Sequence, residues 1–149
     1  MTTALSGSEI ATRLGEKFAD GILEVGQDSL VLKAELLPDI ASFLKTTPGL
    51  DFDYLASITG VDYRSYFEVV YHLVSLEHNH SLVVKVRCHQ RNEPAVPSVV
   101  SLWQGADFQE REIFDLMGIR FKGHPNMKRI FLWEGFEGHS LRKDYNSGT

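Results

Sequence analysis

The chain has 149 residues, a formal net charge of −5 and a single cysteine, Cys88. A chain of this length forms one domain and buries roughly two-thirds of its unfolded surface, so its core needs neither disulfides nor structural metals. One cysteine excludes a disulfide framework and, from this chain alone, an iron–sulfur cluster or a thiolate zinc site. The negative charge argues against nucleic acid as a partner.

The sequence also bears on the compartment. No apolar run approaches the ~20 residues that a membrane-spanning helix needs, and the first residues lack the basic and apolar regions of a signal peptide. A lone cysteine is typical of a reducing compartment, most simply the cytoplasm. We therefore expect any contact with a membrane to be indirect, through partner proteins.

The first third of the chain predicts a helix, a hairpin and a second helix. An apolar stripe at helical spacing follows Ser8 and predicts a capped helix over residues 8–19. Two β-rich runs, Ile22–Val25 and Leu30–Lys33, flank a turn-forming stretch and predict a hairpin. A second helix carries Pro38 in its first turn and ends before the next proline.

The middle of the chain is rich in strand signals. Residues 52–58 alternate in polarity, with Phe52, Tyr54, Ala56 and Ile58 at every second position. The run Phe67–Leu76 has apolar residues on both faces, as expected of a central strand, and Leu82–Cys88 alternates again. The short links between these strands predict an antiparallel meander.

The predicted order defines an α+β fold, with helices packed on an antiparallel or mixed β-sheet and an irregular C-terminal extension. We expect an α+β domain over residues 1–123 and a basic tail over 124–149 that packs on the domain and on partners. Residues 1–119 hold nine Lys/Arg and seventeen Asp/Glu, whereas residues 120–149 hold six and three. This asymmetry is either the common unevenness of surface charge or the sign of a tail that docks on an acidic surface.

A third helix is predicted over residues 103–117 and ends at Gly118. Its apolar face also carries two carboxylates, Asp107 and Glu110. One interpretation places both acids at the wet edge of that face. The alternative buries Glu110 against a basic residue of the tail, and it pairs Asp107 with an arginine one turn later. The apolar residues of this face are Trp103, Ala106, Ile113, Phe114 and Met117. The expected basic partner is Arg129 or Arg142 for Glu110, and Arg111 for Asp107.

Few residues suggest chemistry by this chain itself. The six histidines show no metal-ligand spacing, and neither a nucleophile turn nor a phosphate-binding glycine loop is present. Cys88 sits on the apolar face of its strand, which indicates a buried, inert thiol. Glu112 and Asp115 could converge on one substrate, whereas Glu110 points away from Glu112 on a helix. No pocket signal accompanies that pair, so we expect the isolated chain to be non-catalytic.

The second half of the third predicted helix and the residues after it are the most specific feature of the sequence. Residues 110–130 read EREIFDLMGIRFKGHPNMKRI, and residues 138–145 read GHSLRKDY. Both stretches resemble the signature of the C subunit family of respiratory complex I, also called the 30 kDa subunit of NADH:quinone oxidoreductase. Ser140 stands where that family usually has proline, which makes the geometry of the tail turn less rigid.

The resemblance implies a non-catalytic, peripheral-arm component of a proton-translocating NADH:quinone oxidoreductase, on the cytoplasmic face of the cell membrane. It implies partners that form the quinone pocket and hold the terminal iron–sulfur cluster. It also implies no cofactor in this chain, with FMN, iron–sulfur clusters and quinone in partner subunits. The alternatives are the equivalent subunit of a membrane-bound nickel–iron hydrogenase or another alternative-donor complex, and a free-standing enzyme or metal-binding protein.

By this resemblance a polar network joins the third helix, the tail and a partner subunit as interface and framework. Its expected members are Glu110, Arg111, Glu112, Asp115, His124, Pro125, Arg129, Arg142, Lys143 and Asp144.

Overall fold

The computed structural model describes residues 2–125, and these form an α+β fold with helices packed on a mixed sheet, as the sequence predicted. The strands are β1 (Thr3–Ala4), β2 (Ile22–Val25), β3 (Ser29–Leu32), β4 (Tyr54–Asp62), β5 (Phe67–Ser75), β6 (His80–Cys88), β7 (Ala95–Pro97) and β8 (Arg120–Lys122). The helices are α1 (Gly7–Leu14), α2 (Leu37–Thr46) and α3 (Ala106–Met117), with 3₁₀ helices at Gly15–Gly21 and Ala34–Leu36. No helix in this part of the chain is long and apolar enough to cross a membrane.

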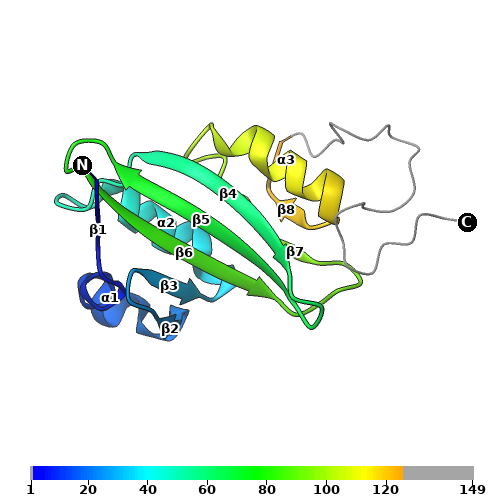
Figure 1. Ribbon diagram of the computed structural model, residues 1–149, viewed down its shortest axis with the longest axis horizontal. Helices are drawn as coiled ribbons and strands as arrows, with labels where there is room; N and C mark the ends of the chain where they lie inside the picture. Colours follow the sequence, from blue (N-terminus) through cyan, green and yellow to red (C-terminus); the bar gives the residue numbers. More distant parts are fainter. Residues whose placement is uncertain (1, 126–149) are drawn as a thin grey trace, which may run out of the picture.

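The main sheet has the strand order β2-β3-β6-β5-β4 (Figure 1). β4, β5 and β6 form the predicted antiparallel meander, with β5 in its centre. β2 and β3 form the predicted hairpin, and β3 joins β6 in parallel. β1 also runs parallel to β6, and β7 and β8 form a separate parallel pair.

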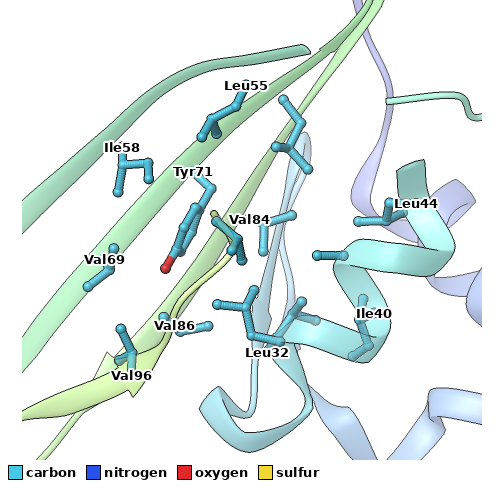
Figure 2. Close-up of a cluster of buried hydrophobic side chains, with 14 of the residues drawn as sticks. Leu32, Ile40, Leu44, Leu55, Ile58, Val69, Tyr71, Val84, Val86 and Val96 are labelled. Atoms are coloured by element: carbon cyan, nitrogen blue, oxygen red, sulfur yellow. The ribbon is translucent and has the colours of Figure 1, made fainter. Parts of the chain in front are cut away.

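The core lies between one face of this sheet and α2, which Figure 1 shows behind the strands. β-Branched and aliphatic side chains from the strands meet the inner face of α2, and Figure 2 shows Tyr71 among them. Three α2 residues, Leu37, Ile40 and Leu44, are at most 2% exposed. Burying an aliphatic side chain contributes about 1.5–3 kcal/mol, so this layer supplies much of the stability of the fold.

The first helix differs from the predicted one. α1 begins after Ser6, whose Oγ accepts a hydrogen bond from the backbone N–H of Glu9 at 3.1 Å. It ends at Leu14, because Gly15 adopts a positive φ of 58° that closes the helix. A 3₁₀ helix follows, with a kink at Phe18. The cap is thus two residues earlier than predicted, and the helix is shorter.

The alternation predicted for residues 52–58 is interrupted in the structure. A register shift in β4 falls between Leu55 and Ser57. Both Leu55 and Ile58 are therefore buried although they are three residues apart, whereas Tyr54 is 50% exposed. Such a bulge places two residues opposite one and reverses which side chains face the core.

Two further local predictions need correction. Trp103 precedes the third helix, which begins at Ala106, and its indole Nε1 donates to the backbone oxygen of Phe52 at 3.1 Å. Cys88 is only half-buried, because it is the last residue of β6. Its thiol donates to the backbone oxygen of Gln90 at 3.6 Å.

Candidate functional site

The signature helix α3 packs alongside β4, the edge strand of the meander (Figure 1). A Cβ atom at Gly60 would lie 2.7 Å from the Met117 sulfur and 3.2 Å from Ile113 Cγ2, so glycine allows the helix to approach the strand. The side-chain oxygen of Gln109 accepts a hydrogen bond from the backbone N–H of Ile58 at 2.6 Å. Packing and a polar contact together fix the position of α3.

Glu110 is completely buried on the inner face of α3. Its carboxylate accepts hydrogen bonds from the Ser98 hydroxyl at 2.5 Å and from the backbone N–H of Val99 at 2.9 Å. Burial raises the pKa of Glu110 above its ordinary value, and the two hydrogen bonds act in the opposite direction. Glu110 is therefore buried, as one of the two interpretations expected, and within residues 2–125 it bonds to the segment that follows β7.

The phenol of Tyr71 is another buried titratable group in this region. Its hydroxyl has no hydrogen-bond partner among residues 2–125. Burial raises the pKa of Tyr71 well above its usual range, and the charge of Glu110 adds to the effect. Glu110 thus affects the pKa of Tyr71 through its charge, with no hydrogen bond between the two in this part of the chain.

Asp107 lies at the wet edge of α3, with its side chain 49% exposed. The Nε2 atom of His124 is 3.0 Å from Asp107 Oδ1 and 3.3 Å from the Asp107 backbone oxygen. The His124 side chain itself is buried. The start of the predicted tail is thus fastened to the first turn of α3, where Arg111 was the expected partner of the acid.

The structure brings most of the described signature residues together on one helix. Asp115 is completely buried, like Glu110. Arg111 and Glu112 are half-buried, and Pro125 is exposed. Outside the described residues lie Arg129, Arg142, Lys143 and Asp144, and with them the predicted pairing of Glu110 with Arg129 or Arg142.

Within residues 2–125, hydrogen bonds join α3 to β4 and to the segment after β7. Its carboxylates do not gather with other His, Cys, Asp or Glu ligands into a metal-binding group within residues 2–125. Glu110 is occupied by hydrogen bonds to the chain itself. Sequence reasoning missed Ser98 and Gln109 as partners, because only the folded chain brings residues so far apart into contact.

Comparisons with known proteins give a consistent result. The family model described as "Respiratory-chain NADH dehydrogenase, 30 Kd subunit" matches residues 30–149. The C subunit of the NADH-quinone oxidoreductase of Roseiflexus sp. (strain RS-1) is 41% identical over 153 residues, which cover 98% of this chain and 87% of that protein. A second relative, C subunit 2 of the NADH-quinone oxidoreductase of Rhizobium etli (strain CIAT 652), is 39% identical over 145 residues, with 95% and 76% covered.

A solved structure shares the fold. One chain of the membrane-bound sulfane sulfur reductase, described as an archaeal respiratory membrane complex, superposes with a TM-score of 0.76 at 25% sequence identity. The match covers 95% of this chain and 86% of that chain.

Proposed function

The chain belongs to the family of the respiratory-chain NADH dehydrogenase 30 kDa subunit, and from this we propose that it is the C subunit of an NADH–quinone oxidoreductase. It is then one component of a multi-subunit, membrane-associated respiratory complex, and other subunits of that complex are its partners. The observation that carries the proposal is the 41% identity to such a C subunit over 98% of the chain. The names of these relatives favour this function over that of a hydrogenase component.

The role proposed for the chain within the complex is structural. The buried carboxylate of Glu110 is used to hold α3 against the segment after β7, which supports a framework role rather than catalysis. We expect no redox cofactor in this chain, with FMN, iron–sulfur clusters and quinone held by partners. The immediate partners proposed are the quinone-pocket subunit and the terminal iron–sulfur subunit, in a peripheral arm on the cytoplasmic face of the membrane.

The outer side of α3 is the surface proposed to face a partner. Phe108 is 49% exposed, and Arg111 and Glu112 are half-buried. Because residues three and four positions apart share one face of a helix, these three side chains form a single stripe. An aromatic residue flanked by charges is typical of the centre and rim of a protein–protein interface.

Native purification of the complex tests the proposed function. The chain, tagged at its natural expression level, should co-purify with NADH-binding, iron–sulfur and quinone-pocket subunits, and the purified complex should reduce quinone with NADH. Co-purification with hydrogenase subunits, in the absence of NADH-binding subunits, would instead support the alternative assignment.

A pair of matched substitutions tests the proposed surface. Phe108→Asp places a charge at the centre of the stripe and should reduce recovery of the partner subunits at least about tenfold, as expected when an interface aromatic is lost. Tyr63→Asp is the control, because Tyr63 is also 49% exposed but lies between β4 and β5. Equal recovery with both variants, each with wild-type circular dichroism, would show that the stripe is not an interface.

A further inference from the structure

Two loops meet at the end of the sheet farthest from β7 and β8 (Figure 1). One is the segment after α2, which contains Asp51, and the other is the β5–β6 turn, which contains Glu77 and His78. One ligand atom from each of these three side chains lies within 4.8 Å of the other two. Within the described residues, this is the group of His, Cys, Asp and Glu side chains that could hold a metal ion.

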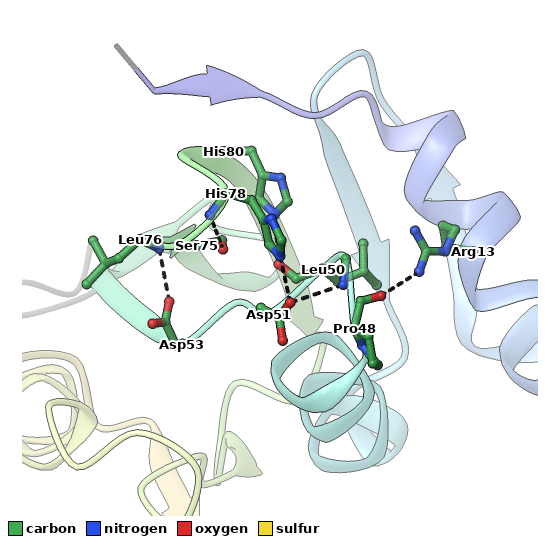
Figure 3. Close-up of polar contacts among 10 residues, drawn as sticks. Arg13, Pro48, Leu50, Asp51, Asp53, Ser75, Leu76, His78 and His80 are labelled. Carbon is green, nitrogen blue, oxygen red and sulfur yellow. Dashed lines mark hydrogen bonds and ion pairs between the residues drawn. The ribbon is translucent and has the colours of Figure 1, made fainter.

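The shortest distance in this group joins the imidazole to one carboxylate. His78 Nε2 is 2.7 Å from Asp51 Oδ2, and Figure 3 shows the two side chains pointing toward one another. This hydrogen bond holds the pKa of Asp51 below its ordinary value. Both side chains are about one-third exposed, His78 by 35% and Asp51 by 30%, so an ion from solvent can reach them.

The main chain around these side chains is held from several directions (Figure 3). Asp51 Oδ2 also accepts from the backbone N–H of Gly49 at 3.0 Å. The backbone N–H of His78 donates to Ser75 Oγ at 3.1 Å. A ligand whose backbone is already fixed loses less conformational freedom when it binds an ion, which raises its affinity.

A second set of contacts joins the two loops to each other. His80 Nε2 lies 2.7 Å from the backbone oxygen of Leu50. The backbone N–H of Leu76 donates to Asp53 Oδ1 at 3.0 Å. The loops therefore keep their relative position through groups that are not themselves the ligands.

We propose that Asp51, Glu77 and His78 form a surface binding site for a divalent transition-metal ion, with Zn²⁺ as the preferred ion. One imidazole and two carboxylates are ligands that Zn²⁺ accepts, at about 2.0–2.2 Å from the ion, with water in the remaining position. Two ligands of a tetrahedral ion at that distance are about 3.4 Å apart. The His78–Asp51 pair has only to open slightly, and the ion then takes the place of the proton that the two side chains share.

Binding of the ion should clamp the β5–β6 turn to the segment after α2. Any ion that binds the folded chain and not the unfolded chain shifts the unfolding equilibrium toward the folded state. The site shares no residue with α3 and does not depend on the proposed role of the chain in a complex. Its failure would leave the family assignment unchanged.

Equilibrium dialysis of the full 149-residue chain without an affinity tag, against buffered Zn²⁺, tests the proposal. The chain should take up one ion, and its melting temperature should rise as free Zn²⁺ increases. Asp51→Asn suits the positive φ of 43° at this position and keeps a hydrogen-bonding side chain, but removes the charge. It should weaken binding at least about tenfold, as should His78→Ala.

Asp53→Asn is the matched control, because Asp53 lies in the same loop and is not among the three ligands. Its affinity for Zn²⁺ should stay within about twofold of the wild type. Each variant should show the wild-type circular dichroism spectrum before zinc is added. The absence of stoichiometric uptake by the wild type, or equal affinity in all three variants, would overturn the proposal and leave His78–Asp51 as an ion pair only.

Discussion

The carboxylate of Glu110, in the middle of α3, lies 2.9 Å from the backbone nitrogen of Val99. This contact joins the signature helix to the irregular segment between β7 and α3. The same carboxylate also accepts from the hydroxyl of Ser98. One acidic side chain thus satisfies two donors that would otherwise be left in a partly or fully buried position.

Glu110→Ala should destabilise the chain by about 3 kcal/mol, because it leaves the Val99 N–H buried without its acceptor. Urea unfolding of the purified chain, followed by circular dichroism, measures this change. Glu112→Ala is the matched control on the same helix, where a half-buried side chain should change stability by about 0.5 kcal/mol or less. Similar losses in both variants would mean that the Glu110 hydrogen bonds contribute nothing specific.

The stability of the chain should depend on pH through the same residue. Burial raises the pKa of Glu110 above its ordinary value of 4.5. Between pH 4.5 and the raised pKa of the folded state, the folded chain holds more protons than the unfolded chain. The free energy of unfolding therefore falls as the pH rises through that window. The side chain in Glu110→Gln does not titrate, so the free energy of unfolding of this variant should rise relative to that of the wild type over the same window.

Urea unfolding of the wild type and of Glu110→Gln at a series of pH values gives this difference directly. It should grow from pH 4.5 upward and become constant above the raised pKa. If the difference in unfolding free energy stays constant, or changes in favour of the wild type as the pH rises, the pKa of Glu110 is not raised in the folded chain.

Tyr71→Phe should stabilise the chain by about 1 kcal/mol. The hydroxyl is buried without a hydrogen-bond partner among residues 2–125, so its removal also removes the free energy spent on its desolvation. Thermal unfolding by calorimetry measures the effect, with Tyr63→Phe as the exposed control. A clear loss of stability in Tyr71→Phe would indicate that the hydroxyl is hydrogen-bonded in the folded chain.

Gly60→Ala should destabilise the contact between α3 and β4 by about 1 kcal/mol. The added methyl group would meet Met117 and Ile113 at less than van der Waals distance, and one of them has to move. Gly105→Ala is the control, because a Cβ there meets nothing within 4 Å. If Gly60→Ala melts at the wild-type temperature, α3 does not depend on this close approach.

Much of the fold could be predicted because its signals are local. The central position of β5 follows from apolar residues on both faces of Phe67–Ser75, and the helix stop at Gly118 follows from a conformation that glycine adopts easily. The parallel pairing of β3 with β6 could not be predicted, because nothing within either strand specifies its distant neighbour. The bulge at Leu55 was also hidden, since alternation alone does not reveal an extra residue.

The candidate site shows the same division. The helical period of α3 placed the Glu110 carboxylate on the apolar face of the helix. In the structure this acid is buried, and hydrogen bonds from Ser98 and Val99 satisfy it. The hydrogen-bond partners of Glu110 depend on how the segment after β7 passes the helix, and helical periodicity does not predict that path. The pairing of His124 with Asp107 depends in the same way on the course of the chain after α3.

The hydrogen bond from Ile58 to Gln109 has a consequence for how the chain survives before assembly. β4 is the outermost strand of the meander, and an uncovered edge offers its backbone groups to a strand of any other molecule. By lying along this edge and accepting one of its N–H groups, α3 blocks such pairing. The helix that carries the family signature should therefore also limit aggregation through this edge. Substitutions that loosen α3 should reduce the yield of soluble chain even when no partner is present.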